Sequence, residues 1–504
     1  MIPAAKSYPT VVHMLEDAGL RAGHAEALVC GEVRLTYAEY VRCVAGFARE
    51  LQALGATGQR VALLCGNSIE AAVASFAIQA AGAVFCPMNP AYTARELGEA
   101  LADAGCLIAV CDAGAAAIVR GLGLKVVELG GETANWVARW RDDWGQTLTG
   151  LLPEPDALGM IQYTGGTTGR SKGVMLRHRA VAMNVAQREA LLPTESGDRF
   201  LCMMPLFHSF AMAMNLYQAA WCAGAMVILP RYRPDWVLET LVKEKISVLP
   251  AGATVFIGLL NFDGFAATDF AHLRVCYSGA SALPAEIMRR WQDATGCAIY
   301  EGYGQTEAGP ILTYNSPHFP AKPGSVGLPL PDTDVQIVDV ETGTRVLPPG
   351  ESGEIRARGP QLMLGYWQRP EETASALRDG WLYTGDIGAF DADGHLAIQD
   401  RKKDMVISGG YNIYPREVDD VLLAHPAVRE AATFGVPDAY RGETVVSHVV
   451  AGNATVDELL AHCRANLAKY KVPAVLRLVD ALPKTSVGKI DKKALRASST
   501  LSLE

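Results

Sequence analysis

The sequence has no excess of basic residues. Its 504 residues include 45 Lys and Arg against 54 Asp and Glu, which gives a formal net charge of −9. A general nucleic-acid binder takes its affinity from surplus Lys and Arg that neutralise phosphates. The composition therefore argues against a nucleic-acid partner, although it is compatible with one local cationic pocket for a nucleotide. A chain of this length predicts two or more domains.

Paired cysteines and zinc motifs are also lacking. The eleven cysteines are scattered, and the sequence contains no CxxC pair and no HExxH. This pattern is typical of buried, reduced thiols in a cytoplasmic protein and argues against a structural zinc site. The first ten residues, MIPAAKSYPT, have no basic flank followed by an apolar stretch, so we expect no signal peptide and a cytoplasmic location.

Long uncharged runs occur at 71–88 and 201–230, and neither has the character of a membrane span. The first run is rich in Ala and Gly. The second is interrupted by Pro205, His208, Asn215, Gln218 and Gly224. A membrane helix needs about 20 predominantly apolar residues. We therefore expect no transmembrane span, and in each run a buried helix that continues into a buried strand.

Apolar β-rich runs alternate with helical patterns through the first three hundred residues. This order predicts an α/β fold with parallel sheets covered by helices on both faces. From about residue 323 the chain becomes Pro- and Gly-punctuated, which predicts a small antiparallel or barrel-like region over about 323–400. A charged cluster at 399–410 precedes a short α+β pattern. We expect an N-terminal body over 1–400 and a mobile C-terminal cap over 401–504, with a hinge near 400–404.

The stretch YTGGTTGRSKGVML (163–176) is rich in glycine and threonine. It matches neither GxxxxGK[ST] nor GxGxxG, the two common phosphate-binding patterns. Its glycines nevertheless allow backbone N–H groups to approach an anion closely, its threonines supply hydroxyl donors, and Lys172 supplies charge. The alternative is an ordinary hairpin turn between two strands. The loop alone does not decide between these interpretations.

Four further motifs accompany the loop. EGYGQTEAGP (301–310) combines an aromatic ring, Tyr303, with Glu307; the ring can cover a purine and the carboxylate can reach Mg²⁺ on phosphates. GWLYTGDIG (380–388) places Asp386 in a tight turn, where it can accept two hydrogen bonds from ribose hydroxyls. Arg401 lies near the expected domain junction, and PKTSVGKIDKKAL (483–495) sets Lys489 in a polar loop. Each motif alone could be a turn or a solvated charge run, but their joint order is not expected by chance.

With these motifs the sequence resembles the adenylate-forming (ANL) superfamily, which includes acyl-CoA synthetases, firefly luciferase and peptide-synthetase adenylation domains. The resemblance runs from about residue 10 to 495 and is closest to bacterial medium- and long-chain fatty-acid–CoA ligases. Two departures are Gly165, where the family usually has Ser, and Ser171, where it usually has Pro. The first removes one hydroxyl donor to phosphate.

The resemblance implies a ligase that uses ATP, Mg²⁺ and coenzyme A. A carboxylate attacks the α-phosphate to give acyl-AMP and pyrophosphate, and a thiol then attacks the acyl carbon. By this resemblance, the β- and γ-phosphates would be bound by Thr164, Gly165, Gly166, Thr167, Thr168, Gly169 and Lys172. Mg²⁺ would be bound by Glu307 and Thr167. Adenosine would be bound by Gly302, Tyr303, Gly304, Gln305, Asp386 and Arg401. The catalytic residues would be Lys489, Glu307, Thr306 and His208, with Lys489 bridging carboxylate and α-phosphate and His208 as a gate or floor residue rather than a proton carrier.

The resemblance also implies a rotation of the cap between the two steps. Lys403 would be the hinge residue. The turn would remove Lys489 from the site and bring in SGGYN (408–412), with Gly409, Gly410 and Tyr411 at the pantetheine tunnel. Glycines suit a wall that lets a thin chain pass. The alternative is an ordinary interdomain linker.

The acid is expected to be apolar. Residues 208–230 contain no Asp, Glu, Arg or Lys, and a buried charged head group would need such a partner, so amino acids and dicarboxylates are disfavoured. The resemblance places Phe210, Met212, Met214, Gly279 and Ala280 at the acyl pocket, although a methionine stripe on its own is more often plain core. We predict a medium- or long-chain fatty acid, with an aryl acid such as a benzoate or cinnamate as the next candidate.

Three other functions remain open from the sequence. The enzyme could pass the acyl group to a free-standing acyl carrier protein, since no carrier domain is attached. A luciferase-like oxygenase shares the adenylation motifs. A binding or scaffold protein without catalysis would need a damaged site, whereas Glu307, Asp386, Arg401 and Lys489 are all present. The sequence also leaves the oligomeric state open, including a homodimer.

Overall fold

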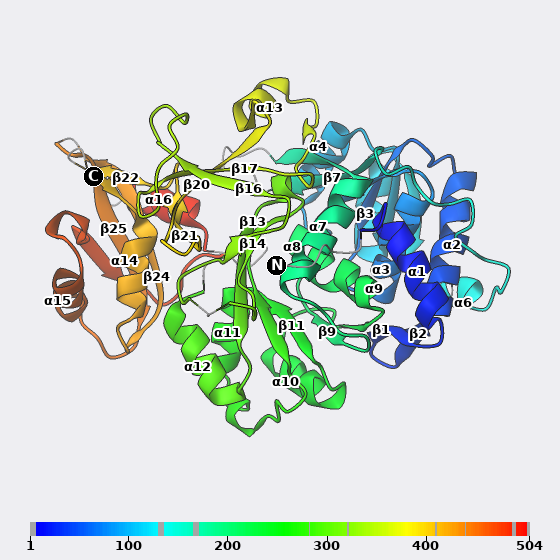
Figure 1. Cartoon of the computed structure of the whole chain (residues 1–504), viewed down its shortest axis with the longest axis horizontal. Helices are drawn as coiled ribbons and strands as arrows, with labels where there is room; N and C mark the ends of the chain where they lie inside the picture. Colours follow the sequence, from blue (N-terminus) through cyan, green and yellow to red (C-terminus); the bar gives the residue numbers. More distant parts are fainter. Residues whose placement is uncertain are drawn as a thin grey trace.

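The computed structural model describes residues 7–129, 136–164, 171–281, 283–319, 322–408, 411–438, 440–485 and 490–500. It confirms the predicted α/β class. Two large sheets and their helices form the N-terminal part of the chain, a small antiparallel sheet follows, and an α+β unit ends it (Figure 1). All eleven cysteines are free thiols, and ten are buried, which confirms the prediction of reduced cysteines.

The first large sheet has seven strands in the order β18-β8-β7-β4-β3-β5-β6. Its parallel part comprises β4 (Val84–Pro87), β3 (Arg60–Leu64), β5 (Ile108–Asp112), β6 (Lys125–Leu129) and β7 (Leu158–Thr164). The strands β8 (Lys172–Arg177) and β18 (Gly365–Tyr366) extend it in antiparallel pairing. The connecting helices include α3 (Ile69–Ala80), α4 (Ala94–Ala104) and α5 (Ala113–Gly121). Capping-box residues Thr93 and Glu96 fix the start of α4.

The second large sheet has nine strands in the order β15-β14-β13-β12-β11-β9-β10-β1-β2. Their bounds are β1 (Glu26–Cys30), β2 (Val33–Thr36), β9 (Arg199–Cys202), β10 (Ala225–Ile228), β11 (Val248–Ala251), β12 (Val275–Ser278), β13 (Ile299–Gly304), β14 (Ile311–Tyr314) and β15 (Leu328–Pro329). The associated helices are α1 (Val11–Ala22), α2 (Tyr37–Ala53), α6 (Trp136–Arg141), α7 (His178–Leu191), α10 (Pro234–Lys243), α11 (Ala253–Leu260) and α12 (Ala285–Thr295). One hydrophobic core joins this sheet to the first.

Both long uncharged runs fold as predicted, with one difference. Residues 71–88 contain most of α3 and then β4. Within 201–230, the short helix α8 (Ser209–Ala211) continues into a π-helix, η1 (Met212–Tyr217), and α9 (Gln218–Cys222) before β10. The sequence did not predict the wider π-helical turn, which often marks a functional site. Among the described residues, the structure has no helix whose length and apolar character would suffice for a membrane crossing.

The region expected to be antiparallel or barrel-like is an open antiparallel sheet. Its strands are β16 (Asp334–Val338), β17 (Gly353–Arg358), β19 (Leu377–Arg378), β20 (Trp381–Phe390) and β21 (Leu396–Arg401), with α13 (Pro370–Ala376) beside them. In Figure 1 this sheet lies between the large sheets and the C-terminal unit. Its last two strands carry the chain toward the expected hinge.

The C-terminal unit has its own sheet, in the order β23-β22-β25-β24 with β26 beside β25. Its strands are β22 (Val406–Ser408), β23 (Tyr411–Ile413), β24 (Val428–Asp438), β25 (Gly442–Ala451) and β26 (Val475–Leu478), and its helices are α14 (Pro415–Leu423), α15 (Val456–Asn466) and α16 (Lys492–Thr500). A separate core packs α14 and α15 on this sheet. The Arg416 backbone N–H donates to Asp400 Oδ2 at 2.9 Å, which joins α14 to the end of β21.

Candidate active site

The glycine loop connects two strands that pair directly. β7 and β8 form an antiparallel hairpin in which Thr164 lies opposite Lys172. The loop therefore leaves the carboxyl end of β7, the end at which α/β sheets commonly bind ligands. The hairpin of the alternative interpretation is thus present, but its strands bring a lysine to this end of the sheet. The predicted phosphate-binding residues Gly165, Gly166, Thr167, Thr168 and Gly169 lie outside the described residues.

Glu307 and Lys172 both contact Tyr366. Glu307 lies in the 3-10 helix η3 (Thr306–Ala308) after β13, and Tyr366 lies in β18 beside β8. The Tyr366 hydroxyl donates to Glu307 Oε1 at 2.8 Å, and Lys172 Nζ lies 4.9 Å from the centre of the Tyr366 ring. Oε2 of Glu307 has no hydrogen-bond partner among the described residues. Since one oxygen is held and the other is available, the carboxylate fits a role as a ligand of a hard cation such as Mg²⁺.

Tyr303, Asp386 and Arg401 form one cluster from three strands. The Tyr303 hydroxyl in β13 donates to Asp386 Oδ2 in β20 at 2.6 Å. Arg401 in β21 lies opposite Asp386 in the register, and its Nε is 3.4 Å from Asp386 Oδ1. Burial raises the pKa of Asp386, and the Arg401 guanidinium opposes that rise. The structure thus brings together three residues that the sequence assigns to adenosine, with Gly302, Gly304 and Gln305 beside them along the chain.

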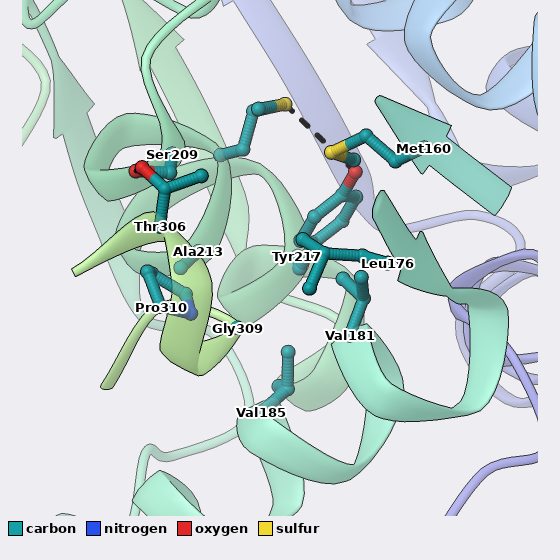
Figure 2. A pocket seen from close by; sticks show the side chains of 11 residues that line it. Met160, Leu176, Val181, Val185, Ser209, Ala213, Tyr217, Thr306, Gly309 and Pro310 are labelled. Carbon is teal, nitrogen blue, oxygen red and sulfur yellow. Dashed lines mark hydrogen bonds between the residues drawn. The ribbon is translucent and has the colours of Figure 1, made fainter. Parts of the chain in front are cut away.

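A small apolar pocket, partly open to solvent, lies next to η3. It is lined by Met160, Leu176, Val181, Val185, Ser209, Met212, Ala213, Tyr217, Thr306, Gly309 and Pro310. Figure 2 shows these side chains converging from α7, the β7–β8 hairpin and the π-helix. Its polar groups include the Ser209 and Thr306 hydroxyls, whose oxygens are 3.4 Å apart. Because Thr306 precedes Glu307, the cavity begins directly beside the expected magnesium ligand.

The residues predicted at the acyl pocket divide between this cavity and its surroundings. Met212 is part of the lining, whereas Phe210, Met214, Gly279 and Ala280 are not among the lining residues. Phe210 lies against Gly279, because a Cβ at Gly279 would come within 2.8 Å of a Phe210 ring atom. His208 Nδ1 accepts a hydrogen bond from the Phe210 backbone N–H at 3.2 Å, which caps α8. That bond fits a fixed wall residue at position 208.

The residues assigned to the second step are described only in part. Burial lowers the pKa of Lys403, and the neighbouring Asp404 carboxylate opposes this shift. Asp404 also accepts from Arg496 of α16 at 2.8 Å, so the expected hinge is tied to the last helix. Tyr411 is 56% exposed, and its ring stacks on that of Tyr470 with 4.5 Å between centroids. Lys489, Gly409 and Gly410 lie outside the described residues.

Sequence reasoning missed Tyr366 and Ser209. Tyr366 is 59 residues from Glu307 along the chain, and only the fold brings the two together. The available signal was the Gly365–Tyr366 pair at the end of a β-rich segment, which is common in strands without function. Ser209 adjoins the predicted His208, but only the fold places the Ser209 hydroxyl at the pocket.

Replacing Tyr366 with phenylalanine is expected to lower the adenylation rate about 10-fold, because a hydrogen bond that orients a carboxylate contributes of that order. The variant should also need more Mg²⁺ for half-maximal rate, since Glu307 loses the bond that holds it. Titration of Mg²⁺ against acid-dependent pyrophosphate release measures both effects. Tyr440→Phe, at a tyrosine that is 94% exposed, is the matched control. An unchanged Mg²⁺ dependence in Tyr366→Phe would contradict a positioning role.

Glu301 is a buried carboxyl group at the start of the EGYGQTE motif. It is 2% exposed and accepts from the Leu283 backbone N–H at 3.1 Å. Burial raises its pKa from 4.5 to about 7, and Arg416 of α14 opposes the rise. The folded chain therefore binds more protons at this site than the unfolded chain does between these two values. The resulting stability is complete below about pH 4.5 and is lost as the pH rises through 7.

Glu301→Gln is expected to stabilise the protein at pH 8 relative to the parent, by roughly 3 kcal/mol at most. The amide keeps an oxygen for the Leu283 N–H and removes the cost of burying a negative charge. The difference in unfolding free energy should grow between pH 5 and pH 7 and then level off. Denaturant unfolding at several pH values, with the exposed Glu341→Gln as control, measures it. If the difference in unfolding free energy between Glu301→Gln and the parent became smaller as the pH rises, the raised pKa of Glu301 would be contradicted.

Comparison with known proteins identifies the family of the chain. The AMP-binding enzyme family matches residues 15–367, and the AMP-binding enzyme C-terminal domain matches residues 417–489. The chain therefore belongs to the AMP-binding enzyme family and is an AMP-forming acid–thiol ligase.

Individual relatives differ in the acids they are named for. The chain is 36% identical to a long-chain-fatty-acid–CoA ligase of Bacillus subtilis (strain 168), over 97% of this chain and 95% of that protein. It is 37% identical to a feruloyl-CoA synthase of Amycolatopsis sp, over 94% and 96%. The solved structure of ATP-bound MatB from Rhodopseudomonas palustris is 34% identical and superimposes with a TM-score of 0.89 over 97% of this chain and 98% of that one. The two named enzymes thus share acyl-CoA formation and differ in the acid.

Proposed function

We propose that this ligase activates a medium- or long-chain fatty acid with ATP and transfers the acyl group to coenzyme A. The observation that carries the proposal is the apolar cavity that begins at Thr306, beside Glu307. A fatty acid placed there would have its chain among methionine and valine side chains and its carboxylate near Thr306. The absence of Asp, Glu, Arg and Lys from residues 208–230 favours an uncharged acyl group over an amino acid.

In this proposal the Tyr303–Asp386–Arg401 cluster binds adenosine. Asp386 accepts hydrogen bonds from the ribose hydroxyls, for which a buried carboxylate with two oxygens is suited. Arg401 compensates its charge, and the Tyr303 ring covers the purine while its hydroxyl fixes Asp386. Gly302, Gly304 and Gln305 are expected to border the base.

The glycine loop and Glu307 are expected to hold the phosphate end of the nucleotide. Thr164, Lys172 and the loop between them would bind the β- and γ-phosphates, and Glu307 with Thr167 would bind Mg²⁺. Bound Mg²⁺ neutralises phosphate charge during the displacement. Lys172 lies against the Tyr366 ring, so its ammonium is near the same carboxylate that would hold the metal.

The first step exchanges a phosphoanhydride bond of ATP for the mixed carboxylic–phosphoric anhydride bond of the acyl adenylate. A carboxylate oxygen of the acid attacks the α-phosphorus, the bond to the bridging oxygen breaks, and pyrophosphate leaves with the electron pair. Lys489 would bridge the carboxylate and the α-phosphate, where its charge offsets the charge that grows in the transition state. Thr306 and His208 would border the reacting carboxylate.

The second step is expected after rotation of the C-terminal unit about Lys403. The coenzyme A thiol, losing its proton, would attack the acyl carbon of the adenylate, and AMP would leave. Gly409, Gly410 and Tyr411 would form the passage for the pantetheine arm. The division of the chain into 1–400 and 401–504 remains part of this proposal, as does a cytoplasmic location, which suits eleven free thiols.

A second candidate acid is an aryl acid such as a cinnamate or benzoate. The cavity is lined by short and branched side chains on one side and by the Tyr217 ring on another, a shape that also suits a flat ring. The similarity to a feruloyl-CoA synthase favours this candidate independently of the cavity. Transfer to an acyl carrier protein in place of coenzyme A is the corresponding alternative for the acceptor.

The test is acid-dependent AMP formation over a panel of acids, with and without coenzyme A. The panel comprises C4 to C18 fatty acids, benzoate, cinnamate, malonate and several amino acids. We expect coenzyme A-dependent turnover within one range of fatty-acid chain length. Turnover confined to the aryl acids would establish the second candidate, and adenylate that forms but ignores coenzyme A would indicate a carrier-protein acceptor. AMP formation from none of the acids would contradict the ligase proposal.

A further inference from the structure

Arg188 in α7 is a fully buried guanidinium that is only partly satisfied. Its side chain is 1% exposed. Nη2 lies 3.4 Å from Glu189 Oε2, and Cζ lies 4.9 Å from the centre of the Tyr277 ring. Nε and Nη1 have no hydrogen-bond partner among the described residues. A buried guanidinium with two unpaired donors is costly, so an acceptor beside it, either a bound group or ordered water, would be stabilising.

The α7 side of the apolar cavity leads to Arg188. Val181 and Val185 line the cavity, and Figure 2 shows both on this helix. Together with Arg188 they follow i, i+4, i+7 spacing, which places all three on one helix face. Arg188 therefore lies about one turn beyond Val185, in the direction away from the amino end of α7.

The opposite wall leads to the same point. Tyr217, the last residue of the π-helix, lines the cavity, and the next residue, Gln218, donates through Nε2 to Glu189. Oε1 of Gln218 is buried and has no hydrogen-bond partner among the described residues. Two lining segments are thus followed along the chain by a buried polar side chain that is not itself among the lining residues, one with unpaired donors and one with an unpaired acceptor.

The strands beneath connect this polar end to the nucleotide side. The Tyr277 ring under Arg188 meets the Tyr314 ring edge-on at 6.0 Å. Tyr314 in turn lies against the backbone of Gly302, where a Cβ would come within 2.3 Å of its ring. The contacts run from Gly302, next to Tyr303, to Arg188.

We propose that Arg188 and Gln218 recognise a neutral oxygen group at the far end of the acyl chain or ring. The inference rests on the proposed function and names its substrate class more closely: an acid that is apolar in its middle and carries a hydroxyl or related oxygen at its distal end. Arg188 donates to that oxygen, and the Gln218 carbonyl accepts from its hydroxyl. A 4-hydroxyaryl acid and an ω-hydroxy fatty acid present the same chemistry.

The charge balance around Arg188 favours a neutral group over a second carboxylate. Glu189 already pairs with Arg188 and is held by Gln218 and by the Thr194 backbone N–H. A distal carboxylate would add an uncompensated negative charge to a buried site, and a distal ammonium would meet the guanidinium. A hydroxyl adds no charge. Its oxygen can accept a hydrogen bond from Arg188, and its hydrogen can be donated to the Gln218 side-chain carbonyl.

Two matched pairs of acids test this inference. One pair is cinnamate and 4-hydroxycinnamate, and the other is decanoate and 10-hydroxydecanoate. For the parent enzyme we expect kcat/KM for the hydroxylated acid to exceed that for its partner by at least about 10-fold in one pair, and which pair responds identifies the aryl or alkyl source. Arg188→Met should lower that ratio by about 10- to 100-fold, mainly through the hydroxylated acid. Gln218→Leu should lower it in the same direction.

Arg179→Met is the matched control, because Arg179 lies in the same helix but pairs with Asp156 at the surface. MgATP binding by each variant shows whether that variant is folded. If a variant does not fold, the ratio of kcat/KM for the hydroxylated and unsubstituted acids in the parent enzyme still tests the proposal. Three outcomes would overturn the proposal: equal kcat/KM for both acids in each pair, a higher kcat/KM for the unsubstituted acids, or an unchanged ratio in folded Arg188→Met. Ordered water would then be the partner of Arg188. AMP formation from none of the acids would instead contradict the proposed function itself and remove the inference with it.

Discussion

Lys489→Ala is expected to lower the rate of adenylate formation by about 10²–10³-fold, which is the typical effect of removing one preorganised group that stabilises transition-state charge. Formation of acyl-CoA from supplied acyl-AMP should be nearly unchanged, because in the proposed mechanism Lys489 has left the site before the thiol attacks. Rapid-quench measurement of each half-reaction separates the two effects. A loss confined to one step is what a moving cap predicts.

Lys484→Ala is the matched control for this variant. Lys484 lies in the same C-terminal segment and pairs with Glu430 at 2.6 Å in a partly exposed ion pair. Such pairs contribute little, so neither half-reaction should change by more than about 2-fold. Equal losses in both half-reactions of Lys489→Ala would contradict the assignment of this lysine to the first step alone, and no loss in either would remove it from the mechanism.

Glu307→Gln is expected to reduce adenylate formation by about 10²-fold at a fixed, moderate Mg²⁺ concentration, since the neutral amide is a poorer ligand for a hard cation. The hydrogen bond from Tyr366 can persist to the amide oxygen, so the fold around η3 should be retained. Raising the Mg²⁺ concentration should recover part of the rate. Pyrophosphate release measured across a Mg²⁺ series, with unfolding curves for both proteins, tests each part.

The exposed Glu341→Gln serves as the control for Glu307→Gln and should match the parent throughout the Mg²⁺ series. Tyr366→Phe should show the same direction of change as Glu307→Gln with a smaller size. If Glu307→Gln lost activity with no change in Mg²⁺ dependence, a role in shaping η3 rather than in binding metal would be indicated.

Much of the fold could be predicted from local patterns. The alternation of β-rich runs with helical segments indicated parallel sheets, because strand, helix and strand repeat along the chain at the spacing of such units. The π-helix at Met212–Tyr217 could not be predicted, since its residues have ordinary helical character. The open form of the antiparallel sheet after residue 323 likewise depends on strand pairing.

Sequence motifs pointed to those candidate residues that lie within short patterns. Residues that only long-range contacts bring to the cluster were missed. Tyr303, Asp386 and Arg401 were assigned from three separate motifs, and the strand register brings them together. Tyr366 and Arg188 carried no comparable signal. Arg188 in particular sits in a helix with several polar residues, and only its 1% exposure and idle nitrogens distinguish it from a surface arginine.

The central claim is that one chain makes an acyl adenylate and then a thioester. It is tested most directly by incubating the protein with MgATP and the best acid of the panel, quenching a single turnover, and identifying the products by mass spectrometry before and after coenzyme A is added. The account predicts acyl-AMP and pyrophosphate in the first sample, and acyl-CoA and AMP at the expense of acyl-AMP in the second. ATP consumption that does not depend on the acid, or acyl-AMP that coenzyme A leaves untouched, would contradict it.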